Sequence, residues 1–184
     1  MNLITDLVEL KRVVEGWRAA GLRIGFVPTM GALHDGHLSL VEHAKTRCDR
    51  VITSIFVNPL QFGPDEDLDR YPRDLAKDQA LLDDRDVDAL FFPTPDLIYG
   101  PGHQTKVGLD VITKPLCGAS RVGHFEGVTT VVCILFNLVK PHTVFLGRKD
   151  YQQYRVIERM VSDLHMDIEV IACPIVREGD GLAM

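Results

Sequence analysis

The chain has 184 residues, of which 46% are hydrophobic and 25% charged, and its formal net charge is −6 at pH 7. These values are ordinary for a globular protein with one buried core, and the acidic balance argues against a nucleic-acid-binding surface. The N-terminal segment contains Asp6 and Glu9, unlike a secretory or transit peptide, and the most apolar segment, 128–139, is too short to span a bilayer. The cysteines form no pattern typical of a disulfide framework or a zinc site; they are Cys48, Cys117, Cys133 and Cys173. We therefore expect a soluble, cytoplasmic protein.

The first predicted elements are a helix and a buried strand. Thr5 is a candidate N-cap for a helix whose apolar residues recur at helical spacing and which ends near Gly21. Residues 24–27 form a short apolar run with β-branched residues, which is typical of a buried parallel strand. A loop follows over 28–36, and a helix is predicted over 37–47.

The loop over 28–36 leads into a helix, an arrangement that favours anion binding. The first N–H groups of a helix have no internal partner, and the helix dipole is positive there. His34 and His37 flank the predicted helix start, where imidazoles can donate hydrogen bonds to phosphate oxygens and titrate near neutral pH. Two other interpretations stay open: metal ligands, for which no third ligand is obvious nearby, and residues that cap and fill the loop. Spacing and context favour phosphate binding.

A second strand is predicted over 51–57 and completes a β–α–β unit. Its exit loop, 58–63, should lie beside the loop with the two histidines, because open parallel sheets bind ligands beyond the carboxyl ends of their strands. Gln61 stands between apolar neighbours, where a buried amide needs hydrogen-bond partners. Asn58 can simply end the strand before a proline.

The middle of the chain has one clear helix–strand pair and one weak region. The acidic segment 64–71 is predicted on the surface, followed by a helix over 74–85 and a strand over 87–92. The pattern weakens over 97–115, and we predict an irregular excursion or a small hairpin with a possible β-segment at 105–111.

A second loop–helix transition lies at 117–127, where a glycine-rich loop carries Arg121 and His124 before a helix predicted over 128–138. The start of this helix is a second candidate site for an anion or a carboxylate. On the residues alone, ordinary surface roles are equally possible.

The final predicted unit is a strand over 143–146, an exit loop over 147–150, a helix over 151–164 and a strand over 168–174. Lys149 is suited to phosphate, Asp150 can accept from a ribose hydroxyl, and Gln153 can face the same cleft. The alternative is a charged surface corner. Strands that alternate with helices throughout predict an α/β fold with a doubly wound parallel sheet of Rossmann-like type.

Four segments in this order resemble the pantothenate synthetase (pantoate–β-alanine ligase) family. That family is a branch of the HxGH nucleotidyltransferase superfamily, which is related in fold to the class I aminoacyl-tRNA synthetases. The segments are PTMGALHDGH at 28–37, FVNPLQF at 56–62, SRVGHFEG at 120–127 and GRKD at 147–150. Val122 and Arg148 depart from the proline and glutamate that are usual in the family.

The resemblance implies an activity and a set of site residues. The implied reaction is the ATP-dependent condensation of pantoate with β-alanine to pantothenate through pantoyl adenylate, with release of AMP and pyrophosphate and with Mg²⁺ on the nucleotide phosphates. His37 would be the catalytic acid, and His34 and Lys149 would also be catalytic. The implied ATP-binding residues are Met30, Gly31, His34, Gly36, His37, Gly147, Lys149, Asp150 and Val176. The implied residues for pantoate and β-alanine are Gln61, Gln153, Asn58, Arg121 and His124.

Some features stay open even with the resemblance. The magnesium ligands are undetermined, because the chain offers many candidate carboxylates: Asp65, Glu66, Asp67, Asp69, Asp74 and Asp78. The family implies a homodimer. It also implies that residues 1–184 form the N-terminal nucleotide- and pantoate-binding domain, without the smaller C-terminal lid domain, so we expect reduced or no full turnover. The alternatives are another HxGH adenylyltransferase, or a ligand-binding fragment without catalysis.

Overall fold

The structure is a computed structural model, and it describes residues 1–63, 66 and 68–184. The strands of this part of the chain are β1 Asn2–Ile4, β2 Ile24–Thr29, β3 Arg50–Ile55, β4 Ala89–Phe91, β5 Thr143–Gly147 and β6 Glu169–Cys173. The helices are α1 Leu7–Ala19, α2 Asp35–Lys45, α3 Leu75–Asp83, α4 Pro95–Ile98, α5 Cys117–Ser120, α6 His124–Val139 and α7 Tyr151–Asp163. Two 3-10 turns, η1 Pro59–Gln61 and η2 Arg148–Asp150, follow β3 and β5.

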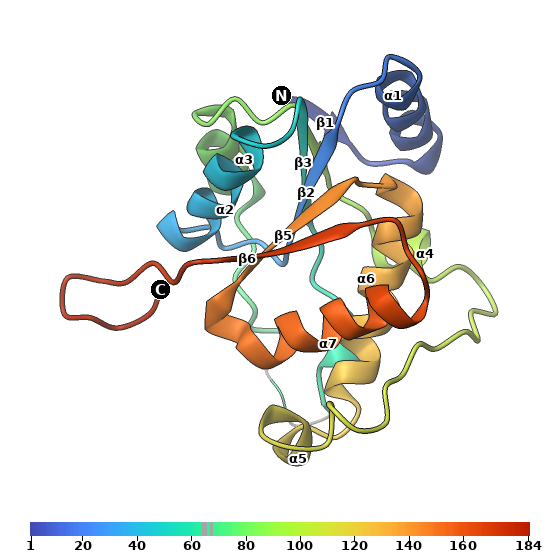
Figure 1. The fold of residues 1–184 in the computed structure, drawn as a ribbon, viewed down its shortest axis with the longest axis vertical. Coiled ribbons are helices and arrows are strands. Elements are labelled where there is room, and N and C mark those ends of the chain that lie inside the picture. The colour runs from blue at the N-terminus through green and yellow to red at the C-terminus, as the bar shows by residue number, and fades with distance from the viewer. Residues whose placement is uncertain (64–65, 67) are drawn as a thin grey trace.

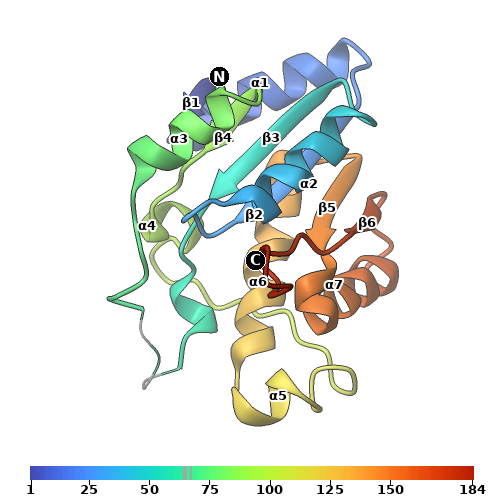
Figure 2. The ribbon, with the colours of Figure 1, turned by 90° about the vertical axis from the view of Figure 1, so that its left-hand side faces the viewer.

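The strands form a single parallel sheet with helices on both faces (Figures 1 and 2). Among the described residues the sheet has six strands in the order β1–β4–β3–β2–β5–β6. The predicted doubly wound α/β fold is therefore confirmed. No helix in the described part of the chain is long and apolar enough to cross a membrane.

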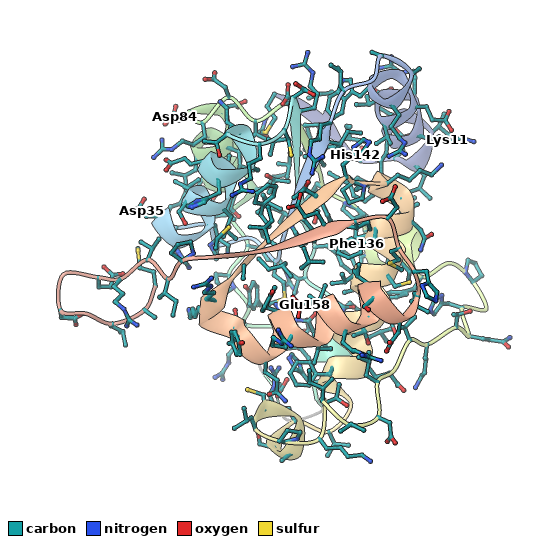
Figure 3. All side chains as sticks on the ribbon, viewed as in Figure 1. Lys11, Asp35, Asp84, Phe136, His142 and Glu158 are labelled. Atoms are coloured by element: carbon teal, nitrogen blue, oxygen red, sulfur yellow. The ribbon has the colours of Figure 1, made fainter. Side chains whose placement is uncertain are left out.

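Two apolar cores lie on opposite faces of the sheet. One packs α1, α6 and α7 against the sheet, and its buried side chains include Phe26 and Phe136, whose rings meet edge to face. The other packs α2 and α3 and includes Val27 and Leu38. Adjacent residues of β2 thus belong to different cores, which explains why its sequence is continuously apolar. Figure 3 shows Phe136 among the side chains that fill the space between sheet and helices, whereas the exposed Lys11 and Asp84 lie at the outer edge.

The centre of the sheet positions the candidate site. The chain builds outward from β2 through β3 and β4 on one side and through β5 and β6 on the other, so the topological switch lies between β2 and β5. The two strands pair only at Gly25↔Thr143 and Phe26↔Val144. Pro28, which has no N–H to donate, follows in β2, and the two strands separate beyond this point. Ligand crevices of doubly wound folds form at such switch points.

The N-terminus differs from its prediction in two ways. β1 was not predicted, and it forms the edge of the sheet by pairing with β4. It is three residues long, too short for a period-two pattern to be visible. Asp6, not Thr5, caps α1, because its carboxylate accepts the Glu9 N–H at 2.8 Å.

Three predictions in the loops also need correction. α2 begins at Asp35, two residues earlier than predicted, and α6 begins at His124, so His124 lies in the first turn of its helix and not in the loop before it. The predicted β-segment at 105–111 is wrong, because no strand forms there. Its backbone bonds to α6 instead: the Val107 N–H donates to Thr130 Oγ1 at 3.0 Å. The predicted surface segment 64–71 falls partly outside the described residues, at 64, 65 and 67.

Candidate functional site

A cleft of about 640 Å³ opens at the carboxyl ends of β2, β3 and β5. Its walls come from the loops after these strands and from the first turns of α2, α6 and α7, which meet in the middle of the molecule (Figure 2). The cleft brings together every residue that the sequence singled out for ligands: Met30, Gly31, His34, Gly36, His37, Asn58, Gln61, Arg121, His124, Gly147, Lys149, Asp150, Gln153 and Val176. Segments far apart in the chain thus contribute to one site.

His34 has a structural role and a free nitrogen. It is the N-cap of α2, and its Nδ1 accepts the Gly36 N–H at 3.1 Å. The neutral ring therefore carries its proton on Nε2. Burial lowers the pKa of His34, and the positive charge of Lys149 lowers it further. The prediction that His34 caps the helix is thus correct for its Nδ1 atom. Its Nε2–H remains available to donate to a ligand.

His37 is more deeply buried, and its ring centroid lies 4.2 Å from that of His34. Burial, followed by His34 and Lys149, lowers the pKa of His37 to about 4. Its Nδ1 is buried without a hydrogen-bond partner among the described residues. Both rings are therefore neutral N–H donors near pH 7, and a bound phosphate would favour their charged forms.

Gly36 allows the ring of His34 to fold over the start of α2. A Cβ at this position would lie 2.8 Å from Cε1 of His34, closer than real Cβ contacts come. A side chain here would therefore displace the capping imidazole.

Asp78 anchors the loop after β2, a role that the sequence analysis missed. Its side chain is 2% exposed, and its carboxylate oxygens accept the N–H groups of Ala32 at 2.9 Å and Leu33 at 2.8 Å. These bonds hold a turn in which Gly31 and Ala32 have positive φ angles of 85° and 52°. The carboxylate of Asp78 therefore occupies backbone N–H groups that would otherwise be open to an anion.

A buried hydrogen-bond network holds the exit loop of β3. Asn58 is 1% exposed, and its Nδ2 donates to Gln61 Oε1 and to the Gly127 carbonyl, each at 3.1 Å. Its Oδ1 accepts the Leu60 N–H at 3.2 Å and the Tyr99 hydroxyl at 2.7 Å. All hydrogen-bonding positions of the Asn58 amide are thus used within the protein. Asn58 thus holds the side chain of Gln61 in place, and Tyr99, which was not predicted to take part, holds Asn58.

Arg121 and His124 form a second network on the same side of the cleft. Arg121 makes a bidentate ion pair with Glu66, with N–O distances of 2.6 and 2.7 Å, and this pair lowers the pKa of Glu66 to about 2. His124 Nδ1 donates to the Gln61 carbonyl at 2.9 Å, which leaves its Nε2 to accept from Arg121 at 3.0 Å. Burial lowers the pKa of His124. Glu126, in contrast, pairs with Lys106 at 2.7 Å.

The loop after β5 contributes charge beside the two histidines. Lys149 and Asp150 are exposed on η2, and the charge of Lys149 reaches both imidazoles. The two glutamines that follow diverge: Gln153 lines the cleft, whereas Gln152 donates to the carbonyls of residues 112 and 115, at 3.1 and 2.7 Å. Arg148 is exposed and is not part of the cleft wall. One end of the cleft thus combines N–H donors, a cation and two helix starts, as a polyphosphate requires.

A model of the pantoate-beta-alanine ligase family matches residues 2–184. The chain belongs to this family. It is 55% identical over 184 residues to the pantothenate synthetase of Thermotoga neapolitana, an alignment that covers 100% of this chain and 66% of the relative. The family prediction from the four segments is therefore confirmed, and the chain spans about two thirds of the length of this relative.

Solved structures of the pantoate–β-alanine ligase family have the same fold. The pantothenate synthetase of Thermus thermophilus matches with a TM-score of 0.93 at 49% identity, over 100% of this chain and 65% of that one. A Francisella tularensis enzyme, described as complexed with beta-gamma ATP and beta-alanine, matches with a TM-score of 0.96 at 40% identity, over 100% of this chain and 70% of that one.

The candidate magnesium ligands of this family member are mostly engaged elsewhere. Asp74 caps α3 by accepting the Lys77 N–H at 3.1 Å, while Glu66 and Asp78 make the contacts described above. Asp69 is exposed, and Asp65 and Asp67 lie outside the described residues. Within the described ranges, no cluster of three histidine, cysteine or carboxylate side chains could hold a metal ion.

Proposed function

We propose that this chain is the N-terminal, nucleotide- and pantoate-binding domain of an AMP-forming pantoate–β-alanine ligase. The observation that carries the proposal is that a single cleft holds two chemically different sets of side chains. One set is His34, His37 and Lys149, which suit phosphates, and the other is the amides of Gln61 and Gln153, which suit a small polar acid. Family membership and the nucleotide and amino-acid ligands named for the Francisella relative support the same assignment.

In the first step the carboxylate of pantoate attacks the α-phosphorus of ATP, and the bond to pyrophosphate breaks. Such in-line transfers depend mainly on positioning and on stabilisation of phosphate charge. His34 donates from Nε2 and Lys149 supplies a fixed positive charge. His37, the catalytic acid that the resemblance implies, takes up a proton when bound phosphate raises its pKa and gives it to an oxygen of the leaving pyrophosphate. A rising negative charge on the phosphate oxygens raises the pKa of both histidines from their lowered values, so that they gain positive character as the step proceeds.

The remaining ATP-binding residues shape the nucleotide pocket. Asp150 accepts from a ribose hydroxyl, while Gly147 and Val176 border the nucleotide from β5 and from the segment after β6. Met30 and Gly31 close the pocket from the loop after β2.

In the second step the amine of β-alanine attacks the acyl carbon of pantoyl adenylate, loses a proton, and AMP leaves. Gln61 and Gln153 hold the pantoyl group in place for this attack. Arg121 and His124 line the cleft beside Gln61, whose backbone carbonyl they contact, and are the candidates for contact with β-alanine.

Three further assignments belong to this proposal. Mg²⁺ prefers one or two carboxylates together with substrate phosphates, so it would be supplied as the ATP complex and held chiefly by the phosphates, whose negative charge it would neutralise. A homodimer through this domain and a cytoplasmic location remain predictions from the family resemblance and the sequence.

Pantoate binding tests the proposed function. We expect saturable binding of pantoate to this chain by calorimetry, tightened by ATP, and a loss of at least about tenfold in affinity in the Gln61→Ala/Gln153→Ala variant, because the amides supply the orienting hydrogen bonds. Gln104→Ala is the matched control, since Gln104 is exposed and outside the cleft wall.

Two results would contradict the proposal. Equal affinities of the wild-type chain and the double variant would show that the two amides do not bind pantoate. Absence of binding at millimolar pantoate, both in this chain and in one extended to the length of its relatives, would remove pantoate as the substrate.

A further inference from the structure

The amide of Asn58 can take only one orientation. The Leu60 N–H can only donate and lies 3.2 Å from Oδ1, whereas the Gly127 carbonyl can only accept and lies 3.1 Å from Nδ2. Exchanging the oxygen and nitrogen would place donor against donor and acceptor against acceptor. Asn58 is 1% exposed, so water would not compensate for the lost bonds. Two backbone groups therefore determine which way the oxygen and the nitrogen of the Asn58 amide point.

Gly127 makes this arrangement possible. A Cβ at this position would lie 2.3 Å from the Leu60 carbonyl oxygen, so only glycine lets α6 approach η1 this closely. The Gly127 carbonyl thereby reaches the Asn58 amide, although the two residues are far apart in the chain.

Asn58 in turn fixes the orientation of Gln61. Its second Nδ2 hydrogen is donated to Gln61 Oε1 at 3.1 Å, so the oxygen of the Gln61 amide faces Asn58. The Gln61 nitrogen lies on the other side, where one hydrogen is donated to Met30 Sδ at 3.1 Å. Its other hydrogen has no partner in the described part of the chain, and Gln61 lines the cleft. The residue is 9% exposed, its backbone carbonyl accepts from His124 Nδ1 at 2.9 Å, and the bonds to Asn58 and Met30 hold its side chain.

We propose that Asn58 and Gly127 hold Gln61 as an obligate hydrogen-bond donor toward the cleft. At this point the cleft accepts a ligand oxygen, such as a carboxylate or hydroxyl oxygen, and rejects a group that only donates, such as an ammonium. If the proposed function is correct, this polarity assigns the Gln61 position to the oxygens of pantoate and keeps the ammonium group of β-alanine away from it. Asn58 is then a positioning residue that determines specificity without touching the ligand.

Gln61→Glu tests this polarity with an isosteric change. One carboxylate oxygen still accepts from Asn58, and the other replaces the donor with an acceptor. Near pH 8 we expect the variant to bind pantoate at least about tenfold more weakly than the wild type, because the introduced carboxylate faces a ligand oxygen and repels it. Near pH 5.5 the ratio of the two affinities should return toward one, because burial raises the pKa of the introduced carboxyl group and its protonated form donates again. An unchanged affinity near pH 8, or a ratio independent of pH, would overturn the proposal.

Two further measurements separate this inference from the proposed function. Gln104→Glu makes the same charge change on an exposed residue outside the cleft and should leave pantoate affinity within about twofold of wild type. Neutron diffraction from crystals of the deuterated, ligand-free protein locates the two deuterons of the Gln61 amide directly. Deuterons on the side of Met30 support the proposal even if pantoate proves not to be the ligand, whereas deuterons on the side of Asn58 refute it.

Discussion

His34 and His37 belong to one short motif, and the fold gives them different surroundings. His34 caps α2 through Nδ1 and leaves Nε2 free, whereas His37 is half-buried in the cleft wall and its Nδ1 has no hydrogen-bond partner among the described residues. Burial and the charge of Lys149 lower the pKa of both rings, so each is poised to gain charge only when an anion arrives. The same burial that suits phosphate binding also makes the folded protein sensitive to acid.

The pH dependence of stability tests the burial of His37. Its pKa is about 4 in the folded protein against an ordinary value of 6.5, so the unfolded chain binds the proton more readily. The contribution to stability is therefore fully present above about pH 6.5 and is lost as the pH falls toward 4. We expect the free energy of unfolding, measured by urea denaturation, to fall between pH 6.5 and pH 4 in both proteins. The fall should be up to about 3 kcal/mol larger in the wild type than in His37→Gln. Parallel pH profiles of the two proteins would contradict this account.

At the scale of elements, the site depends on contacts between a loop and a neighbouring helix. The loop after β2 carries the histidines, and α3 holds this loop through Asp78. In the sequence Asp78 falls between Leu75 and Leu82, on the apolar face of the predicted helix. A charged residue at an inward position was the signal for this role, but periodicity does not say which groups would pair with it.

Asp78→Ala tests the anchor and removes the partner of one buried and one partly buried N–H group, those of Leu33 and Ala32. We expect a loss of about 3 kcal/mol in the free energy of unfolding, together with weaker pantoate and ATP binding, because the loop with Met30 and His34 moves. Asp74→Ala removes only the cap of the same helix and should cost about 1 kcal/mol with little effect on binding. Similar losses from the two variants would show that Asp78 has no special role.

The whole molecule is an open sheet whose cleft is built from both halves. β2 and β3 bring the histidines and Gln61, and β5 brings Lys149, so neither half forms the site alone. The Thermotoga and Thermus relatives extend beyond this region, since the chain covers 66% and 65% of their lengths. We expect the additional part of such relatives to close over the nucleotide and to contribute mainly to the chemical step.

Comparison of this chain with a longer version tests which part binds the substrates and which part contributes to the chemical step. We expect a fusion that adds the remaining segment of the Thermotoga relative to release pyrophosphate from ATP and pantoate at least about tenfold faster, because closure excludes water and completes the site. Pantoate affinity should change only a few-fold, since Gln61 and Gln153 are already in place. Equal rates of pyrophosphate release would show that this domain carries the full first step by itself.

The amino-acid sequence by itself determined the fold class, the strands other than β1 and the grouping of three ligand loops at one edge of the sheet. Continuous apolar runs mark buried parallel strands, and ligand loops follow their carboxyl ends, so His34, Gln61 and Lys149 were placed together without coordinates. Each of these signals lies within a short segment of the chain, so it can be recognised in the sequence without knowledge of long-range contacts.

Only the tertiary structure decided how the residues of the cleft divide their roles. It added β1, showed that the Asn58 amide is fully hydrogen-bonded within the protein with Gln61 among its partners, and identified Tyr99 and Asp78 as supports. It also paired Arg121 with Glu66. Apart from the bond between Asn58 and Gln61, these contacts join residues far apart in the chain. Where the groups are buried the bonds are obligatory, because an unpaired polar group in the core costs free energy. Partners of this kind are chosen by proximity in space, which the order of residues alone does not specify.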